Sequence, residues 1–559
     1  MSRFFNRKSI LCIVVALTLV AAFAGSAVLR GREARAAGGG LTSKSAACAQ
    51  VEKTIWVSSG ALDYCNGPQP NGPAPSGLHK INTFGSNVDA ASPAEDVSPN
   101  GTQAYGQSEV STAAISHYVV EQWNDATGFF SPPCSAGNKD QLSGWGFSSD
   151  GGKSFTDQGG LPNVNCATSS WSGDPSVETW APGGTTYFYQ SSLFSASSLP
   201  NGDFGLLVAL TACKVSPPST ISCNPNPVVL ATNPGTFNFE DKDFMSIDPV
   251  RGLLYVTFTD FNSPPTFDNI DAFVCDIASN PGSPTCYGPV IVASANPSNF
   301  CELEGAYPAV DLATGDVYVA YESNWATNLT AFGPCASLPV QDKVNLVPGP
   351  CASPPSAFPS CSGPFKEADV NITSMDAAFI PGYNRFPMND FPRIAVSDPN
   401  GTVSIVWNDA RYHPAGDILL QSFDLNSLFP TPVQPVPVRI NKAAGGWHML
   451  PALRNVDASG DLNISFYGRA SANTAVTNVY AAIDVNPLAT ATPGNVLVTT
   501  APSNWNAVSS DIVPNFGDYT DNYIIATGSA PFTQEKLFVA WADGRLGVPQ
   551  PFNANTPTT

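Results

Sequence analysis

The fold is decided by a stretch that reads Phe391-Pro-Arg-Ile-Ala-Val-Ser-Asp398 and continues as Thr402-Val-Ser-Ile-Val-Trp407. A short apolar strand runs into an Asp/Asn/Gly turn, and a second strand ending in an aromatic residue follows. The same pattern recurs as Tyr307-Pro-Ala-Val-Asp311 with Asp316-Val-Tyr-Val-Ala-Tyr321, and it occurs seven times between Ser111 and Arg545. A two-strand unit repeated at long period predicts a repeat architecture.

The repeats recur roughly every 60 to 85 residues without helical periodicity between them, which indicates the blades of a propeller. We therefore predict an all-β propeller of four-stranded blades, with seven blades favoured and six as the alternative. Six blades are the alternative because unit two, around Asp174-Pro-Ser-Val-Glu178, is the weakest copy of the repeat, and an insertion is the other interpretation of it. Because unit seven lacks outer strands, we expect Thr54-Ile-Trp-Val-Ser58 to close the last blade.

The chain divides into four parts by composition. Residues 1–36 carry basic residues before a long apolar run, a pattern typical of a secretory signal peptide, with an uncleaved membrane anchor as the alternative. Residues 37–108 are expected to form a linker plus the closing strand, 109–548 the propeller, and 549–559 a polar tail. The body is thus predicted to be secreted, or anchored at the cell surface if the first segment is retained.

Charge and cysteine content agree with export. The formal net charge is −20, which argues against a nucleic-acid partner because phosphate binding relies on clustered Lys and Arg. Of the 13 cysteines, Cys12 lies in the leader, and the even number left in an exported body implies disulfides. Cross-strand pairs are expected for Cys213 with Cys223 and for Cys275 with Cys286. We predict no metal site and no cofactor, since zinc-type spacing and nucleotide-binding fingerprints are both missing from the sequence.

One short motif points to a family. Ser148-Ser-Asp150-Gly-Gly152-Lys-Ser-Phe155 fits the pattern S-x-D-x-G-x-x-[W/F] of an Asp box, a hairpin turn held by its Asp side chain. With the repeated hairpins, the chain resembles the sialidase-like propellers, also called Asp-box or BNR-repeat propellers, over about residues 110 to 546. The box residues Ser148, Asp150, Gly152 and Phe155 are structural in this interpretation.

The resemblance implies a set of catalytic candidates. Family sialidases use three arginines for the substrate carboxylate, a Tyr nucleophile polarised by a Glu, and an Asp acid/base. Arg393-Ile-Ala partly matches the family's Arg-Ile-Pro motif, although Ala395 replaces the proline and the motif falls in unit five. Tyr519, beside Asp518 and Asp521, is the nucleophile candidate, and Glu304 or Asp390 are the proton-transfer candidates.

The arginines allow two interpretations. Arg411, Arg469 and Arg545 each follow a second strand, and together with Arg393 they are candidates for binding a substrate carboxylate through two-pronged hydrogen bonds. The alternative is that they clasp loops to neighbouring blades. An enzyme would aim them into one central pocket, whereas clasps would point sideways between blades.

Two functions follow from these observations. The first is a glycoside hydrolase acting on extracellular glycans, with terminal acidic sugars as one substrate class. The second is a non-catalytic surface propeller that binds glycan or protein. Membrane association is expected only if residues 1–36 stay uncleaved.

Overall fold

The computed structural model describes residues 48, 87–91, 107–125, 128, 141–261, 268–295, 302–325, 339–348, 367–375, 380–383, 390–427, 430–507, 516–527 and 534–543. The expected leader, the closing strand Thr54–Ser58, Arg545 and the polar tail lie outside these residues. No helix among the described residues is long and apolar enough to cross a membrane. Two single-turn 3-10 helices, η3 (Pro182–Gly184) and η6 (Trp505–Ala507), lie among the described residues.

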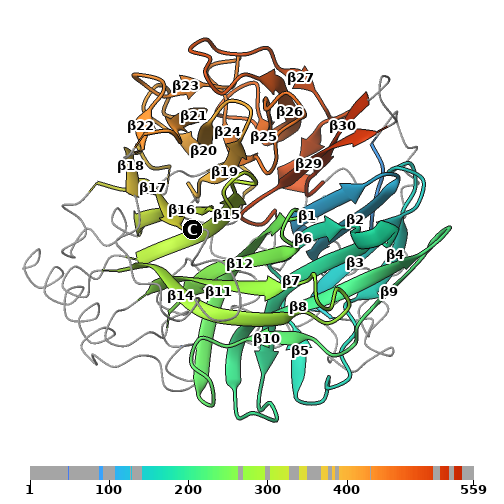
Figure 1. The fold of residues 1–559 in the computed structure, drawn as a ribbon. Coiled ribbons are helices and arrows are strands. Elements are labelled where there is room, and N and C mark those ends of the chain that lie inside the picture. Colours follow the sequence, from blue (N-terminus) through green and yellow to red (C-terminus); the bar gives the residue numbers. More distant parts are fainter. Residues whose placement is uncertain are drawn as a thin grey trace, which may run out of the picture.

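Antiparallel sheets make up the described body, and the repeated hairpins pair as the sequence pattern predicts (Figure 1). The first sheet contains β1 (Ser108–Ile115), β2 (Tyr118–Asn124), β3 (Ser143–Ser148) and β4 (Thr156–Gly160). A ten-stranded sheet contains β5 (Ser169–Trp171), β6 (Ser176–Trp180), β7 (Tyr187–Ala196), β8 (Phe204–Ser216), β9 (Thr220–Cys223), β10 (Val228–Leu230), β11 (Phe237–Asp248), β12 (Leu253–Asp260), β13 (Asn269–Asp276) and β14 (Thr285–Ser294).

The later units form four further sheets. One contains β15 (Glu302–Val310), β16 (Val317–Trp325), β17 (Gln341–Val347) and β18 (Glu367–Asn371). The next contains β19 (Arg393–Ser397), β20 (Thr402–Asp409), β21 (Asp417–Asp424), β22 (Thr431–Pro432) and β23 (Val438–Arg439). The last two contain β24 (His448–Ala452), β25 (Leu462–Gly468), β26 (Val476–Val485), β27 (Val496–Leu497) and β28 (Ser503–Asn504), and then β29 (Asp521–Thr527) with β30 (Gln534–Ala540).

The chain is therefore an all-β propeller, but the expectation of seven four-stranded blades is wrong. Within the described residues, four sheets of four or five strands stand as separate blades. The second and third units merge instead, because the start of β8 pairs in parallel with the start of β11. The seventh unit contributes only the two strands β29 and β30 to the described residues. This parallel pairing joins strands of two different units, and a sequence pattern that describes each unit by itself does not predict it.

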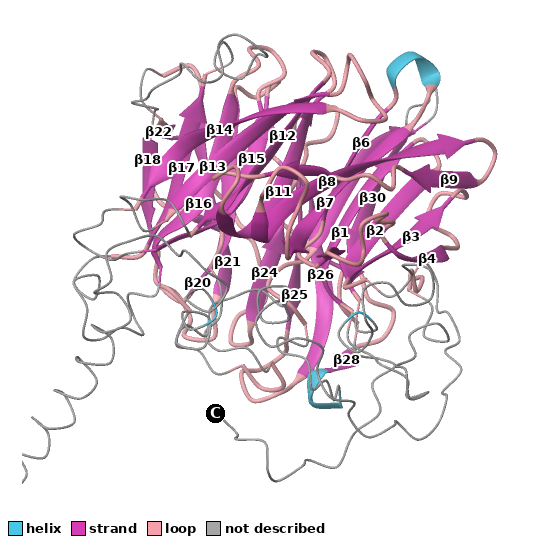
Figure 2. Ribbon diagram, turned by 90° about the horizontal axis from the view of Figure 1, so that it is seen from below, coloured by secondary structure: helices cyan, strands magenta, loops and turns pink. Residues whose placement is uncertain are grey.

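First strands of successive units line the middle of the ring. β1 contacts β6, β6 contacts β11, β11 contacts β15, and β15 contacts β19. The last unit returns to the first, since β29 contacts β1, and Figure 1 shows these two strands side by side. Figure 2 shows the strands from the side, with loops and turns at both ends of the sheets. The ring thus brings residues from both ends of the described chain together.

Buried apolar residues fill the spaces between neighbouring sheets. One core cluster combines Val119 and Phe147 of the first sheet with Phe188 and Leu207 of the second. Burial of such side chains is worth about 1.5–3 kcal/mol each, which is the main force holding the units together. Second strands such as β12 and β20 are buried over their full length, whereas the outer strand β18 alternates buried and exposed residues.

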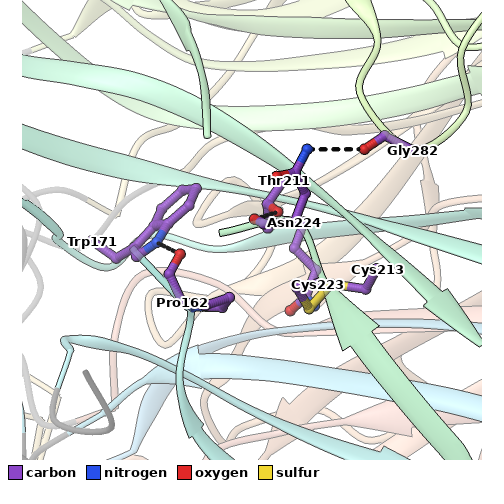
Figure 3. Close-up of a disulfide and its surroundings, with 8 residues drawn as sticks. Pro162, Trp171, Thr211, Cys213, Cys223, Asn224 and Gly282 are labelled. Carbon is purple, nitrogen blue, oxygen red and sulfur yellow. Dashed lines mark hydrogen bonds between the residues drawn. A yellow bond between two sulfur atoms is a disulfide. The ribbon is translucent and has the colours of Figure 1, made fainter. Parts of the chain in front are cut away.

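Both cross-strand disulfides predicted from the sequence are confirmed. Cys213 of β8 is bonded to Cys223 of β9, and Cys275 of β13 is bonded to Cys286 of β14. Figure 3 shows the first of these bonds beside Asn224, whose side chain donates to the carbonyl of Gly282 at 3.1 Å. Disulfides persist in oxidising compartments, which agrees with an extracellular protein.

Candidate functional site in the middle of the ring

A β-bulge recurs near the start of several first strands. The pairing register slips after Ser108 in β1, after Asp241 in β11, after Glu304 in β15 and after Met449 in β24. At each slip one residue has a left-handed backbone, namely Glu109 (φ 53°), Lys242 (φ 57°), Gly305 (φ 73°) and Leu450 (φ 50°). Bulges of this kind re-aim a side chain and are enriched next to active sites.

Two of the four bulge positions carry charged side chains in a conformation that costs free energy. A left-handed backbone at a non-glycine residue costs on the order of 1–3 kcal/mol and persists only where the surroundings enforce it. Asp174, just before β6, has the same backbone conformation (φ 54°). Strain at Glu109, Asp174 and Lys242 therefore converges on one place, and that place is a candidate site.

We define the carboxyl–lysine cluster as Glu109, Asp174, Lys242 and Asp518. The Lys242 ammonium lies 3.1 Å from Asp174 and 3.6 Å from Glu109, and it contacts Asp518 more closely still. All of these side chains are buried. They come from β1, from the turn before β6, from β11 and from the turn before β29, so the cluster joins four units across the ring.

Three carboxyl groups share a single ammonium in this cluster, and its carboxyl oxygens are poorly satisfied. Oε2 of Glu109 accepts a hydrogen bond from the Asn124 amide at 2.5 Å. In contrast, Oε1 of Glu109 and both Asp174 oxygens have no conventional hydrogen-bond partner beyond the Lys242 ion pairs and a carboxyl–carboxyl contact. Burial raises the pKa of Glu109 well above its usual range, and the nearby Asp174 carboxylate raises it further.

The hydrogen bond between the two carboxyl groups raises the pKa of Glu109 and lowers that of Asp174. Burial raises the pKa of Asp174 to about 6, although Lys242 and a hydrogen bond shared with Glu109 pull it down. At neutral pH the proton therefore resides on Glu109, which donates to Asp174. Two carboxyl groups whose pKa values are pushed apart are the arrangement that acid/base catalysis requires.

Asp243 extends the cluster along β11. Its side chain is buried, accepts a hydrogen bond from the Ser191 hydroxyl on β7, and has one oxygen without a hydrogen-bond partner. Burial raises the pKa of Asp243 well above its usual range. The centre of the ring therefore holds more carboxyl groups than the three that belong to the carboxyl–lysine cluster.

Arg393 and Tyr519 are brought together at the centre, as the sequence suggested, but both are engaged by the protein. The Arg393 guanidinium lies 4.7 Å from the ring centre of Phe244, 4.6 Å from that of Tyr307 and 5.2 Å from that of Tyr519. It also donates to the carbonyl of Thr520 at 3.2 Å. This packing holds the guanidinium by cation–π attraction.

Tyr519 differs from what a nucleophile needs. Its hydroxyl donates to the carbonyl of Pro175 at 3.2 Å. Burial raises the pKa of Tyr519 well above its usual range, and the neighbouring carboxylates Asp174 and Glu109 raise it further. A nucleophilic phenol requires the opposite shift.

A second charged group, the Arg454 cluster, consists of Arg454, Glu178, Asp521, Ser111 and Tyr523. Arg454 donates to Asp521 at 2.5 Å, to Ser111 at 3.2 Å and to Glu178 at 3.3 Å, and also to the carbonyl of Val177. The Tyr523 hydroxyl bonds Glu178 at 3.3 Å. Here one guanidinium is matched by two carboxylates, and the group ties β6, β1 and β29 together.

Two further arginine candidates, Arg411 and Arg469, bond to groups of the protein, and Arg545 lies outside the described residues. Arg411 donates to Asp409 at 2.6 Å and 2.9 Å and also bonds the carbonyl of Asn371. Arg469 donates to the carbonyls of Pro381 at 2.7 Å and Thr474 at 2.9 Å. These partners lie on neighbouring loops, so both arginines point between elements and not into a shared carboxylate-binding site.

Neither proton-transfer candidate lies in the carboxyl–lysine cluster. Asp390 accepts hydrogen bonds from the Ser374 hydroxyl at 2.6 Å and the Met375 backbone N–H at 2.7 Å, which tethers the chain ahead of β19. Glu304 is buried on β15, directly opposite Glu322 of β16.

The motif at residues 148–155 forms a turn between β3 and β4. The Asp150 carboxylate accepts from the backbone N–H groups of Lys153 at 2.9 Å and Ser154 at 3.0 Å, and from the Ser154 hydroxyl at 2.6 Å. These bonds lower the pKa of Asp150 to about 2. Gly152 donates to the Ser148 hydroxyl at 2.9 Å, with φ 79° that suits glycine. Phe155 packs against the core shared by the first two units.

Polar residues precede several first strands in the sequence, among them Asp174, Asp518 and the acidic run at 240–243, and they predict a polar rim on the ring; this pattern missed Glu109 and Arg454. The signal for Glu109 is its position relative to the apolar part of β1, which matches that of Lys242 in β11. Among the described residues, no three His, Cys, Asp or Glu side chains are arranged to hold a metal ion.

Comparisons with known proteins give distant likenesses only. No protein-family model and no curated protein matches the chain. An α-L-arabinofuranosidase from Fusarium graminearum is 12% identical with a TM-score of 0.39, over 68% of this chain and 91% of that one. An α-L-arabinanase from Penicillium chrysogenum is 12% identical with a TM-score of 0.39, over 69% and 94%.

A Hadza microbial sialidase is 10% identical with a TM-score of 0.36, over 68% of this chain and 65% of that one. At these identities and TM-scores the likenesses carry no argument about activity. The chain's own sheets establish the β-propeller fold that the sequence resemblance implied.

Proposed function

We propose that the chain is an exported propeller that acts on extracellular glycans as a glycoside hydrolase, with the carboxyl–lysine cluster as its reacting centre. The observation that supports this most is the hydrogen-bonded pair of Glu109 and Asp174 beside Lys242. Glycoside hydrolysis needs one carboxylic acid to protonate the leaving oxygen and one carboxylate to act on the sugar or on water.

The roles follow from the contacts. Glu109 holds the proton, so it is the proton donor. Asp518 makes the closest contact with the Lys242 ammonium, so it is the partner carboxylate. Asp174 accepts the hydrogen bond from Glu109 and thereby orients the carboxyl group that carries the proton.

The substrate class is narrowed to neutral glycans. A carboxylate-bearing sugar needs a bidentate arginine, and among the described candidates Arg393 and Arg411 donate to protein groups, while Arg469 does so through two of its three side-chain nitrogens. The excess of carboxyl groups at the centre also repels an anionic sugar.

A non-catalytic glycan- or protein-binding propeller is the second candidate, and the burial of the cluster favours it. The side chains of Glu109, Asp174 and Lys242 are 0% exposed, so in this alternative they only hold the ring together. Turnover separates the two candidates, because a purely structural cluster hydrolyses nothing.

The test is hydrolysis of a panel of neutral aryl pentosides and hexosides, with an aryl sialoside included, across pH 3 to 8. Glu109→Gln and Asp518→Asn should each lower turnover by about 10²-fold to 10⁴-fold, the usual worth of a general acid or base. The variants should stay folded by circular dichroism. A parent protein inactive on the whole panel would leave the binding propeller as the function.

A further inference from the structure

The carboxyl–lysine cluster lies at the seam where the ring closes. Glu109 belongs to the first unit and Asp518 to the last, and the two contact the same ammonium. Gly517 is packed against this seam, since a Cβ on it would lie 2.3 Å from Cγ of Glu109. Any change of charge in the cluster therefore acts on the junction between the first and last units.

Charge at this seam is unbalanced whenever all carboxyl groups are ionised. The groups that face it are Asn124 of β2, Ser191 of β7, Asp241, Lys242 and Asp243 of β11, Asp174 before β6, and Asp518 with Tyr519 before β29. Arg393, whose guanidinium lies 5.2 Å from the Tyr519 ring centre, also faces this set, and Lys242 is the cation that contacts its carboxyl groups. A single ammonium cannot compensate several buried carboxylates, because charge removed from water is costly unless it is paired.

We propose that the carboxyl–lysine cluster is an acid-dependent lock on the ring, which holds the seam closed while Glu109, Asp174 and Asp243 carry protons and loosens it when they lose them. The proposal rests on the proposed function only in assigning the reacting centre to this place. It adds that the centre is assembled in acidic medium and disassembles as the medium becomes alkaline.

The sign follows from proton linkage. Burial raises the pKa of Asp174 from 3.8 to about 6, and it raises the pKa values of Glu109 and Asp243 well above their usual range. The folded protein thus binds protons that the unfolded chain has released, and stability falls as pH increases from about 4 through the folded pKa values. Burial raises the pKa of Glu240, Asp271 and Asp342 in the same direction.

Lys242 is the positioning residue of the lock. At low pH Glu109, Asp174 and Asp243 carry protons, so the buried ammonium has fewer ionised carboxylates to compensate and its removal costs less than at higher pH. At higher pH the ammonium is needed against ionised carboxylates. Lys242→Met should therefore lower the melting temperature less at pH 4 than at pH 7.5.

The direct test is thermal melting of the full chain at pH 4 and pH 7.5 for the parent, Asp243→Asn and Lys242→Met. The parent should melt lower at pH 7.5. Asp243→Asn keeps the hydrogen bond with Ser191 but removes the ionisable group, so it should melt like the parent at pH 4 and by about 2 °C or more higher at pH 7.5.

Asp150→Asn is the matched control because the pKa of Asp150 is lowered to about 2 by hydrogen bonds. It should melt lower than the parent at both pH values. A parent melting temperature that does not fall between pH 4 and pH 7.5 overturns the lock, as does an Asp243→Asn variant that melts lower than the parent at pH 7.5. These readouts need no substrate, so an inactive protein with the predicted melting pattern refutes only the hydrolase.

Discussion

The Arg454 cluster and the carboxyl–lysine cluster lie in the same ring and differ in one respect. In the Arg454 cluster, a guanidinium meets two carboxylates and every side-chain polar atom has a hydrogen-bond partner. In the carboxyl–lysine cluster, one ammonium meets three carboxyl groups, and oxygens of Glu109 and Asp174 are left without conventional partners.

Under the proposed function, this difference separates a structural group from a reactive one. A satisfied buried network rigidifies a fold, whereas unsatisfied buried carboxyl groups cost free energy that natural proteins tolerate mainly where chemistry needs them. Backbone strain follows the same division, since Glu109, Asp174 and Lys242 have left-handed backbones and Arg454 does not. Substitutions in either cluster test this difference.

The largest expected effect is on the Arg454 cluster. Arg454→Met leaves Glu178 and Asp521 buried without their cation, which should lower the free energy of unfolding by about 3–5 kcal/mol. Guanidinium-induced unfolding at pH 7 measures this. Arg251→Met is the control, because its ion pair with Asp248 is partly exposed and worth about 1 kcal/mol at most. Equal losses in the two variants would contradict a structural role specific to Arg454.

A smaller effect is expected for Arg393, which is charged and buried but belongs to neither cluster. Arg393→Lys keeps the charge but loses the planar contact with three aromatic rings, which should cost about 1–2 kcal/mol of unfolding free energy. Arg411→Lys serves as the comparison, since Arg411 faces a single ring at 5.9 Å. If Arg393→Lys unfolds like the parent while losing substrate binding, Arg393 contacts substrate and the structural interpretation is wrong.

The sequence predicted the propeller because its signals are local. Each hairpin of the repeat is encoded by alternating apolar residues and a turn, and the disulfide Cys213–Cys223 joins directly opposed residues of one such hairpin. The blade count failed because the parallel pairing between Phe204 and Phe237 joins two units over a distance that no local pattern records.

The candidate site could be predicted only in part. Asp174 and Asp518 were placed on the rim because they precede first strands. Arg411 and Arg469 were ambiguous, since the sequence cannot tell whether a guanidinium aims at a loop carbonyl or at a pocket. Glu109 was missed because its importance comes from a bulge that turns its side chain toward Lys242.

The most direct test of the central claim measures both turnover and unfolding free energy for Glu109→Gln and Glu178→Gln, which are matched changes in the two clusters. We predict that Glu109→Gln loses turnover on neutral aryl glycosides by at least about 10²-fold while being at least as stable as the parent at pH 7. Glu178→Gln should lose stability, while its folded molecules turn over substrate at the parent's rate. If Glu109→Gln retains full turnover, or if both variants lose stability alike without loss of turnover, the division between a reactive and a structural cluster is wrong.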